Sequence, residues 1–344
     1  MVEPIRRRED AASVDTSSRD TSPEIPRALR DSPAALERAH AAAVDTAARY
    51  RPTGRPYPAL VARTVGETRE MLDVAIRVGL DATFRVANGP YAVDGHVVEA
   101  RAHFRMGPQH GGTSAELLAA ARKANVPGLY ALQEGRGTLH DLRRVTQALV
   151  DAGHLPAGTE PAGERIHQMQ WNYGVGVDCA GYVQQAFLAA HGGTRATYGW
   201  KTMGYEDLSS VVTNPTFRRV APRDLRPGDL GVLGVPANDA VGHRVIIYSH
   251  KVVDPAKPGK LGEHFGADLA PLLRGGPVHC FEVDSSWGAD GGDPAGGVRR
   301  DTWLYNEKTA VWSYRCGVGN STFCTTTSPY NHPLLGFFRP RSEP

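Results

Sequence analysis

The 344-residue sequence predicts an α+β protein, with helices concentrated before about residue 160 and strands after it. Two observations predict this class. In the first half, apolar residues recur every three or four positions, which is the spacing of an amphipathic helix. After a stretch at 156–163 that contains Pro and Gly, one helical run is followed by several short runs rich in β-branched and aromatic residues, as strands are. This change of pattern predicts a domain boundary between residues 160 and 161.

Composition and charge exclude several classes of protein. The chain is 22% charged with a net charge of +2, and its basic residues form no stripe, so nothing indicates a nucleic-acid partner. No apolar run is long enough for a helix that spans a membrane. The N-terminal residues lack the apolar stretch of a secretory signal. We therefore expect a protein that is cytoplasmic as made, or that is exported by a non-classical or injection route.

The N-terminal half is predicted to be a tail followed by a mostly helical region over 32–160. Residues 1–31 contain no aromatic residue and mix charged residues with Ser, Thr and Pro, so they are expected to be disordered. Helices are expected over 32–50 and 64–78, from a capping box at Thr113–Glu116 onward, and over Thr138–Ala152. Short strands split by Asn88-Gly89 and Asp94-Gly95 are expected between the second and third of these helices.

A cysteine lies where the next helix is expected to begin. In DCAGYVQQAFLAAHGG, apolar residues recur at helical spacing after Asp178, which suits an N-cap, and the run ends at Gly192-Gly193. Cys179 then falls in the first turn, where unpaired backbone N–H groups and the helix dipole stabilise a thiolate. The alternative is a buried cysteine that acts as a small core residue. This stretch alone leaves both interpretations open.

Two later strands supply candidate partners for the thiol. His243 stands at the entry of the run GHRVIIY, which follows the Pro-Gly turn and strand of RPGDLGVL. Asp284 lies near the end of the run VHCFEVDSS, where a carboxylate can orient an imidazole by accepting its N–H. Cys179, His243 and Asp284 are therefore the predicted nucleophile, base and orienting residue. For Asp284, the alternative is a role in capping a turn.

The ordered set DCAGYVQQAF, RPGDLGVL, GHRVIIY and EVDSSWG resembles the NlpC-type cell-wall peptidase family, which is related to the CHAP amidases. The resemblance covers about residues 165–290 and implies a papain-like domain, in which the helix that carries the cysteine packs on an antiparallel sheet. It implies the same three catalytic residues. Ala180 stands where the family usually has Ser, and Asp284 where it usually has His, Asn or Gln. The upstream signature, an aromatic residue followed by Gly-Gly, is shortened to WNYGVGVDC.

The resemblance also implies a function. The expected substrate is an amide bond in peptidoglycan peptides, cleaved by an endopeptidase or amidase that needs no metal or cofactor. Trp171, Tyr173 and Asp178 are the expected substrate-binding residues. A secreted or injected effector or toxin, with delivery machinery and an immunity protein as partners, fits the missing signal. The alternatives are an acyltransferase or a protease that acts on a protein with the same triad, and a non-catalytic module that binds cell wall or a partner.

The region from Val298 onward is rich in aromatic residues, and HPLLGFFRPR is a candidate closing strand. These aromatic residues are expected to pack on the sheet as core; the alternative is that they form a wall of the substrate groove. Cys316 and Cys324 lie in a short loop, where they either form a disulfide or stay reduced. A zinc site that combines them with His279 and Cys280 lacks the CxxC spacing.

Overall fold

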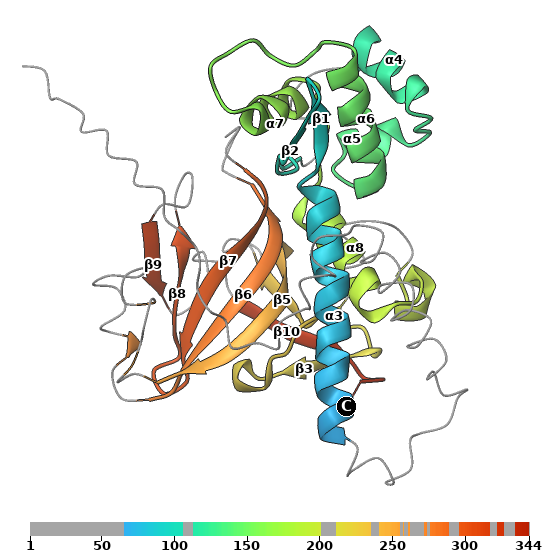
Figure 1. Ribbon diagram of the computed structural model, residues 1–344. Coiled ribbons are helices and arrows are strands. Elements are labelled where there is room, and N and C mark those ends of the chain that lie inside the picture. The colour runs from blue at the N-terminus through green and yellow to red at the C-terminus, as the bar shows by residue number, and fades with distance from the viewer. Residues whose placement is uncertain are drawn as a thin grey trace, which may run out of the picture.

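The computed structural model describes residues 65–105, 113–200, 211–234, 241–254, 257, 261, 272–273, 276–288, 296–316, 322–326 and 334–343. The predicted disordered tail over 1–31 and the predicted helix over 32–50 lie outside the described residues. Within them the protein is α+β, as the sequence predicts, with helices packed on an antiparallel sheet (Figure 1).

The helices precede most of the strands along the chain. Their bounds are α3 Val65–Ala87, α4 Ala115–Lys123, α5 Leu129–Gln133, α6 Leu139–Asp151, α7 Ala162–Asn172 and α8 Cys179–His191. Two short 3-10 helices, η2 Arg195–Tyr198 and η3 Pro222–Asp224, follow α8. In the described part of the chain, no helix combines the length and the apolar character needed to cross a bilayer.

Local side-chain signals set the starts of two helices. Thr138 caps α6 by accepting the Asp141 N–H at 3.0 Å, and α6 ends at Asp151, as predicted. The predicted capping box at Thr113 is wrong. Ser114 is the N-cap of α4, and its hydroxyl accepts the Leu117 N–H at 3.1 Å. The prediction was off by one residue because Thr113 and Ser114 are both good capping residues.

Helix α3 is longer than predicted. It continues past residue 78 to Ala87, because Leu80 and Ala87 extend its buried face into the core of the protein. The strand expected before Asn88 is therefore the end of a helix. A hairpin follows, with β1 Tyr91–Val93 paired to β2 His96–Val98 across the predicted Asp94-Gly95 turn. A Cβ at Gly79 would lie 2.6 Å from the carbonyl oxygen of Ala189, so this glycine lets α3 and α8 approach closely.

The main sheet has eight strands in the order β3-β10-β4-β5-β6-β7-β8-β9, and each neighbouring pair is antiparallel. Their bounds are β3 Phe217–Val220, β4 Leu230–Gly234, β5 Val241–Val253, β6 Val278–Trp287, β7 Gly297–Asn306, β8 Val311–Cys316, β9 Thr322–Thr326 and β10 Leu334–Pro340. The runs RPGDLGVL, GHRVIIY and VHCFEVDSS supply β4, β5 and β6, as predicted. The predicted closing strand is β10, which lies inside the sheet between β3 and β4.

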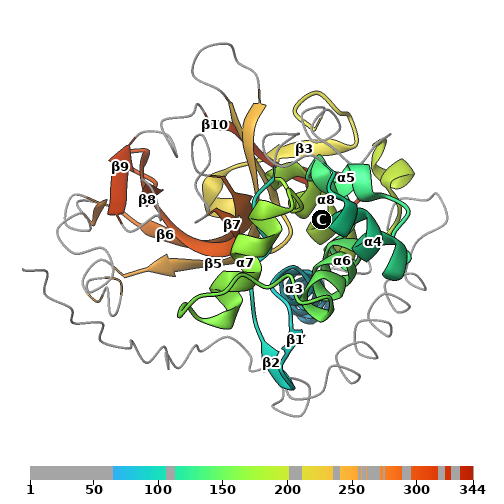
Figure 2. The ribbon, with the colours of Figure 1, turned by 90° about the horizontal axis from the view of Figure 1, so that it is seen from above.

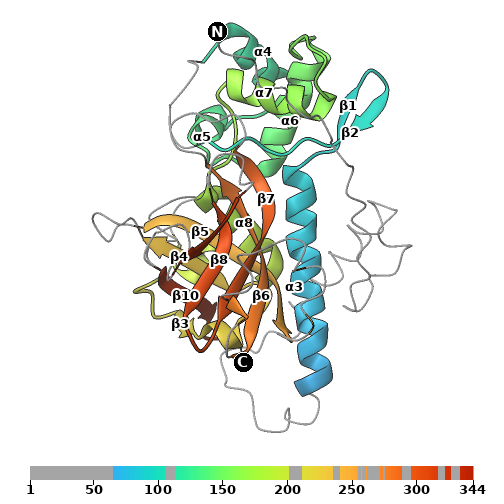
Figure 3. The same cartoon turned by 90° about the vertical axis from the view of Figure 1, so that its left-hand side faces the viewer.

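The helices cover one face of the sheet. Figure 1 shows α3 standing beside the strands, with α4 to α7 and the hairpin gathered at one end. Seen from that end, the helices lie on one side and the strands curl away on the other (Figure 2), and α8 lies behind the sheet in Figure 3. One hydrophobic cluster joins these layers; its members include Leu80, Leu117, Leu149, Val183, Phe187, Leu230, Ile246 and Phe338. The helical region and the sheet thus share a core across the predicted boundary at residue 160.

The opposite face of the sheet carries a second cluster that is rich in tryptophan. It includes Val245, Ile247, Phe281, Val283, Trp287, Trp303, Trp312 and Phe337. Trp303 and Phe337 are 0% and 1% exposed, so these C-terminal aromatic residues are core, as expected, and not the wall of a groove. Pairing of β8 with β9 sets Cys316 opposite Thr322. The side chains of Cys316 and Cys324 lie outside the described residues, so the disulfide stays an open prediction.

Candidate active site

Cys179 is the first residue of α8, as predicted, and Asp178 is its N-cap. Asp178 has extended backbone angles, and its carboxylate accepts the backbone N–H groups of Gly181 and Ala180. Its side chain is buried, and burial raises the pKa of Asp178 to about 6. The structure therefore confirms the predicted helix-capping role of Asp178, and its contact with substrate stays a prediction.

The thiol of Cys179 lies against the start of β5. The backbone N–H of Arg244 hydrogen-bonds the sulfur, and the Ala180 N–H, which also faces the Asp178 carboxylate, adds a weaker attraction. Arg244 directly follows His243, so the predicted nucleophile lies beside the segment that carries the predicted base.

The thiol is protonated at neutral pH. Burial first, and then the negative charge of Asp178, raise the pKa of Cys179 to about 11, while the Arg244 guanidinium and the two backbone N–H groups lower it only in part. The sequence-based prediction of a lowered pKa is therefore wrong for this conformation. The helix dipole favours a thiolate, but the loss of hydration in a site that is 6% exposed outweighs it.

The C-terminal end of β6, residues 285–287, holds the surroundings of the thiol together, and we call it the β6 brace. The hydroxyl of Ser285 donates to the carbonyl oxygen of Arg244 at 2.6 Å. The hydroxyl of Ser286 donates to the carbonyl oxygen of Val177 at 2.7 Å. One strand end thus fixes both the β5 segment that contacts the sulfur and the turn that leads into α8.

Trp287, the last residue of the β6 brace, contacts the predicted base. The rings of His243 and Trp287 have centroids 4.3 Å apart and planes inclined by 31°. His243 is opposite Leu233 in β4, and strand alternation places it with Val245 on the tryptophan-rich face of the sheet. The histidine therefore lies next to the thiol along β5, and its ring is directed toward Trp287.

Asp284 has a different partner from the one predicted. It is opposite Ile246 in β5, on the face that α8 covers, and it is 0% exposed. Its two carboxylate oxygens accept from the Nε and Nη2 of Arg300, at 2.7 and 2.8 Å. The predicted hydrogen bond from His243 to Asp284 is therefore wrong, because the two side chains lie on opposite faces and Arg300 occupies the carboxylate.

Arg300, on β7, connects Asp284 to α3. Its Nη2 also donates to Asp81 at 3.2 Å, and the hydroxyl of Tyr248 donates to the other oxygen of Asp81 at 3.0 Å. The guanidinium carbon lies 3.1 Å from the centroid of the Tyr248 ring. Burial raises the pKa of Asp284 to about 6, although Arg300 opposes this shift. Sequence reasoning missed Arg300, because only the pairing of β6 with β7 sets it opposite Asp284.

The predicted substrate-binding aromatic residues lie at the end of α7. The ring of Trp171 packs edge-on against His103 with centroids 4.9 Å apart, and that of Tyr173 packs against His154 at 5.6 Å. Phe104, which sequence reasoning missed, lies beside Gly288, the residue that follows the β6 brace. It forms a parallel bridge with Val177, and a Cβ at Gly288 would lie 2.5 Å from its ring.

Backbone from the helical region also shapes the site. The Asp178 N–H donates to the carbonyl oxygen of Gly135 at 2.9 Å, and the Arg105 N–H donates to that of Val177 at 3.2 Å. Gly135 has a φ of +74°, and a Cβ there would collide with the Arg105 carbonyl oxygen. The turn before Cys179 is thus held from both sides by residues that precede the predicted domain boundary.

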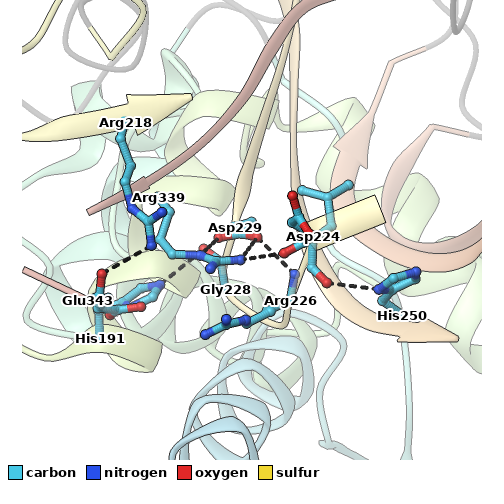
Figure 4. Close-up of polar contacts among 10 residues, drawn as sticks. His191, Arg218, Asp224, Arg226, Gly228, Asp229, His250, Arg339 and Glu343 are labelled. Carbon is cyan, nitrogen blue, oxygen red and sulfur yellow. Dashed lines mark hydrogen bonds and ion pairs between the residues drawn. The ribbon is translucent and has the colours of Figure 1, made fainter. Parts of the chain in front are cut away.

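The RPGDLGVL turn holds the other end of α8 (Figure 4). Asp229 accepts from the Nε and Nη2 of Arg339, at 2.7 and 2.6 Å. His191, the last residue of α8, bonds the Gly228 carbonyl oxygen through Nε2 at 3.0 Å and Glu343 through Nδ1. Both ring nitrogens face oxygen atoms, and this arrangement favours the imidazolium form of His191, because its pKa is raised by Glu343 and by the Gly228 carbonyl group despite burial, which lowers it. This motif therefore anchors the cysteine-bearing helix at the end remote from the thiol.

Comparison of the chain with protein-family models, with curated proteins and with solved structures found no significant match. The resemblance to the NlpC-type family therefore depends on the four sequence motifs. Three of the features that they predict are present in the structure: a cysteine at the start of a helix, that helix packed on an antiparallel sheet, and a histidine near the start of β5.

Proposed function

We propose that this protein is a cysteine hydrolase with a papain-like, NlpC-type domain, and that it cleaves amide bonds in peptidoglycan peptides. The observation that carries the proposal is the environment of the Cys179 sulfur. It lies at the start of α8, is hydrogen-bonded by the backbone N–H of Arg244, and is adjacent to the segment of His243. A cysteine that only filled space would need none of these features.

In the proposed reaction, the ring of His243 first turns from Trp287 toward the start of α8. The proton of the Cys179 thiol then passes to its imidazole as the sulfur attacks the substrate carbonyl carbon. The carbonyl oxygen then becomes an oxyanion that backbone N–H groups at the start of α8 stabilise. The C–N bond breaks, and the imidazolium returns its proton to the leaving amine. Water then attacks the thioester carbon, which releases the acid and restores the thiol. Because the resting thiol is protonated, proton transfer accompanies the attack.

A second candidate is a non-catalytic module that binds cell wall or a partner protein. The observation that favours it is the state of the thiol, which is 6% exposed and has a pKa raised to about 11 by burial and by Asp178. A module that catalyses no reaction can keep a cysteine whose thiol is buried and protonated. A hydrolase needs the substrate to reach it and His243 to accept its proton.

The test is mass spectrometry of the fragments that the purified protein releases from peptidoglycan. The wild type and a Cys280→Ala variant should release new peptide termini, and Cys179→Ala should release none. Cys280 is the matched control, because it is also buried and its pKa is also raised to about 11, mainly by burial, but it lies near the N-terminal end of β6, as the third residue of that strand. Cleavage by Cys179→Ala would refute the proposal. Sedimentation of the protein with peptidoglycan without cleavage would favour the binding module, and transfer of the acyl group to an added amine would indicate an acyltransferase.

A further inference from the structure

The pair of Asp284 and Arg300 is a rigid anchor inside the sheet. The carboxylate is fully buried, and the guanidinium binds it with two parallel hydrogen bonds. Such a fork fixes the orientation of both groups as well as their distance. The outer side of the guanidinium is bound by Asp81 of α3 and covered by the ring of Tyr248. The anchor is thereby held from helix α3 and from one further strand, β5.

The anchor lies directly before the β6 brace. Strands β5 and β6 pair from Val253 opposite Val278 to Ile246 opposite Asp284. Beyond Asp284, the contacts of β6 toward the site are made by the side chains of residues 285–287. These side chains reach the Arg244 carbonyl group, the Val177 carbonyl group and the ring of His243.

From this continuity we propose that Arg300 is a positioning residue of the active site, which acts through Asp284 and the β6 brace on Cys179 and His243. The inference rests on the proposed hydrolase function. If the anchor is removed, the last residues of β6 keep their backbone pairing with β7 but lose the side-chain anchor beside them, so the groups that they hold at Cys179 and His243 can shift. A displacement of about 1 Å in reacting groups can lower a rate by about 100-fold.

The structure offers a matched control for this anchor. Arg339 binds Asp229 with the same two-bond geometry, both side chains are buried, and burial raises the pKa of Asp229 to about 6, as it does for Asp284. That pair holds the C-terminal end of α8. At a helical rise of about 1.5 Å per residue, this end lies roughly 18 Å along the helix from Cys179. Arg339→Met therefore removes an equivalent ion pair at a distance from the site.

Two readouts separate positioning from a loss of stability, both measured well below the thermal transition of each variant. In the folded state, Arg300→Met should lower the rate of peptidoglycan cleavage at saturating substrate by about 10- to 100-fold, with little change in the half-saturating concentration. Arg339→Met should leave both values near those of the wild type. Arg300→Lys should restore part of the rate, because an ammonium can bind the carboxylate but cannot form the fork.

The second readout does not depend on turnover. We expect the ring current of the Trp287 indole, whose centroid lies 4.3 Å from that of His243, to shift the NMR signals of the His243 ring protons. A Trp287→Phe variant gives the reference for a lost indole contact. These signals should move toward that reference in Arg300→Met and stay in place in Arg339→Met. If Arg300→Met does not fold, Asp81→Asn removes only the outer support of Arg300 and should move the signals by a smaller amount in the same direction.

Wild-type His243 signals and a wild-type rate in folded Arg300→Met would overturn the positioning role. So would equal effects of the Arg300 and Arg339 substitutions. Failure of the proposed function is a separate result, because it is shown by cleavage that persists in Cys179→Ala. The His243 signals still decide the role of Arg300 in that case.

Discussion

The sulfur of Cys179 is hydrogen-bonded by the backbone N–H of Arg244, which places the thiol against the sheet as well as at the start of its own helix. The carbonyl group of the same Arg244 is held by Ser285 of the β6 brace. The position of the thiol thus depends on three elements that are far apart in sequence: α8, β5 and β6. Burial is the main cause of the raised pKa of Cys179, and the charge of the buried Asp178 carboxylate adds to it.

The first prediction concerns that carboxylate. Asp178→Asn keeps a side-chain oxygen that can cap α8 but removes the charge that raises the pKa of Cys179. We expect iodoacetamide to alkylate Cys179 at pH 8 at least about threefold faster than in the wild type, because half a pKa unit is worth that factor in thiolate. Mass spectrometry of the labelled peptides gives the rate, with Cys280 as the internal reference. Equal rates in the two proteins would show that Asp178 does not control the thiol.

The local features of this fold could be predicted from the sequence because local side chains specify them. Asp178 begins α8 and Gly192 ends it, Thr138 begins α6, and the Pro-Gly turn precedes β4. These signals for the starts and ends of helices and strands depend only on residues that are neighbours in the sequence. The start of α4 and the end of α3 were misplaced where two residues could cap equally well, or where the core extended the helix.

The partners of the predicted catalytic residues could not be predicted in this way. The face on which His243 and Asp284 lie depends on strand pairing, and β5 has a register shift between Ile247 and Ser249 against β6. Arg300 reaches Asp284 only because β7 pairs with β6 in one register. The motif around Asp284 does not specify how β7 pairs with β6. The sequence alone therefore favoured a contact between Asp284 and His243, whereas in the structure Asp284 forms an ion pair with Arg300.

The second prediction tests the Asp284–Arg300 pair by stability. Removing one member leaves the other buried without its main partner, and each single variant, Asp284→Asn or Arg300→Met, should lower the free energy of unfolding by about 3 kcal/mol. The double variant should lower the free energy of unfolding by clearly less than the sum of the losses in the two single variants. Urea denaturation of the four proteins gives the coupling energy. Additive losses would mean that the two side chains do not depend on each other.

The third prediction uses two glycines with similar backbone angles. Gly228 has a φ of +87° and Gly153 a φ of +80°. A Cβ at Gly228 would lie 2.5 Å from His191 Nε2, whereas nothing lies within 4 Å of one at Gly153. Gly153→Ala should therefore cost only about 1 kcal/mol for its left-handed backbone. Gly228→Ala should cost about 1–3 kcal/mol more for the steric overlap. Equal losses in urea denaturation would mean that the loop at Gly228 moves away freely.

The last prediction concerns the pH dependence of the link between α8 and the C-terminal segment. Burial lowers the pKa of His191, but the charge and hydrogen bond of Glu343, with the Gly228 carbonyl group and the charge of Asp229, outweigh it, so that the pKa is raised from 6.5. Burial raises the pKa of Glu343, but His191, Arg339 and Arg218 lower it from 4.5 overall. The contribution of His191 to stability is present below pH 6.5 and is lost as pH rises through its folded pKa. The contribution of Glu343 is present above pH 4.5 and is lost as pH falls through its folded pKa.

The His191 contribution is lost as pH rises and the Glu343 contribution is lost as pH falls, so the link stabilises the protein most over an intermediate pH range. The stability advantage of the wild type over Glu343→Gln should be largest between pH 4.5 and 6.5 and should shrink on both sides. Urea denaturation of the two proteins across pH 3 to 9 measures this difference, which cancels the titration of groups that the two proteins share. In a His191→Gln background, the maximum should disappear, since the carboxylate then has no imidazolium to bind. A constant difference across this range, or a maximum that survives His191→Gln, would show that the two side chains do not form a charged pair in solution.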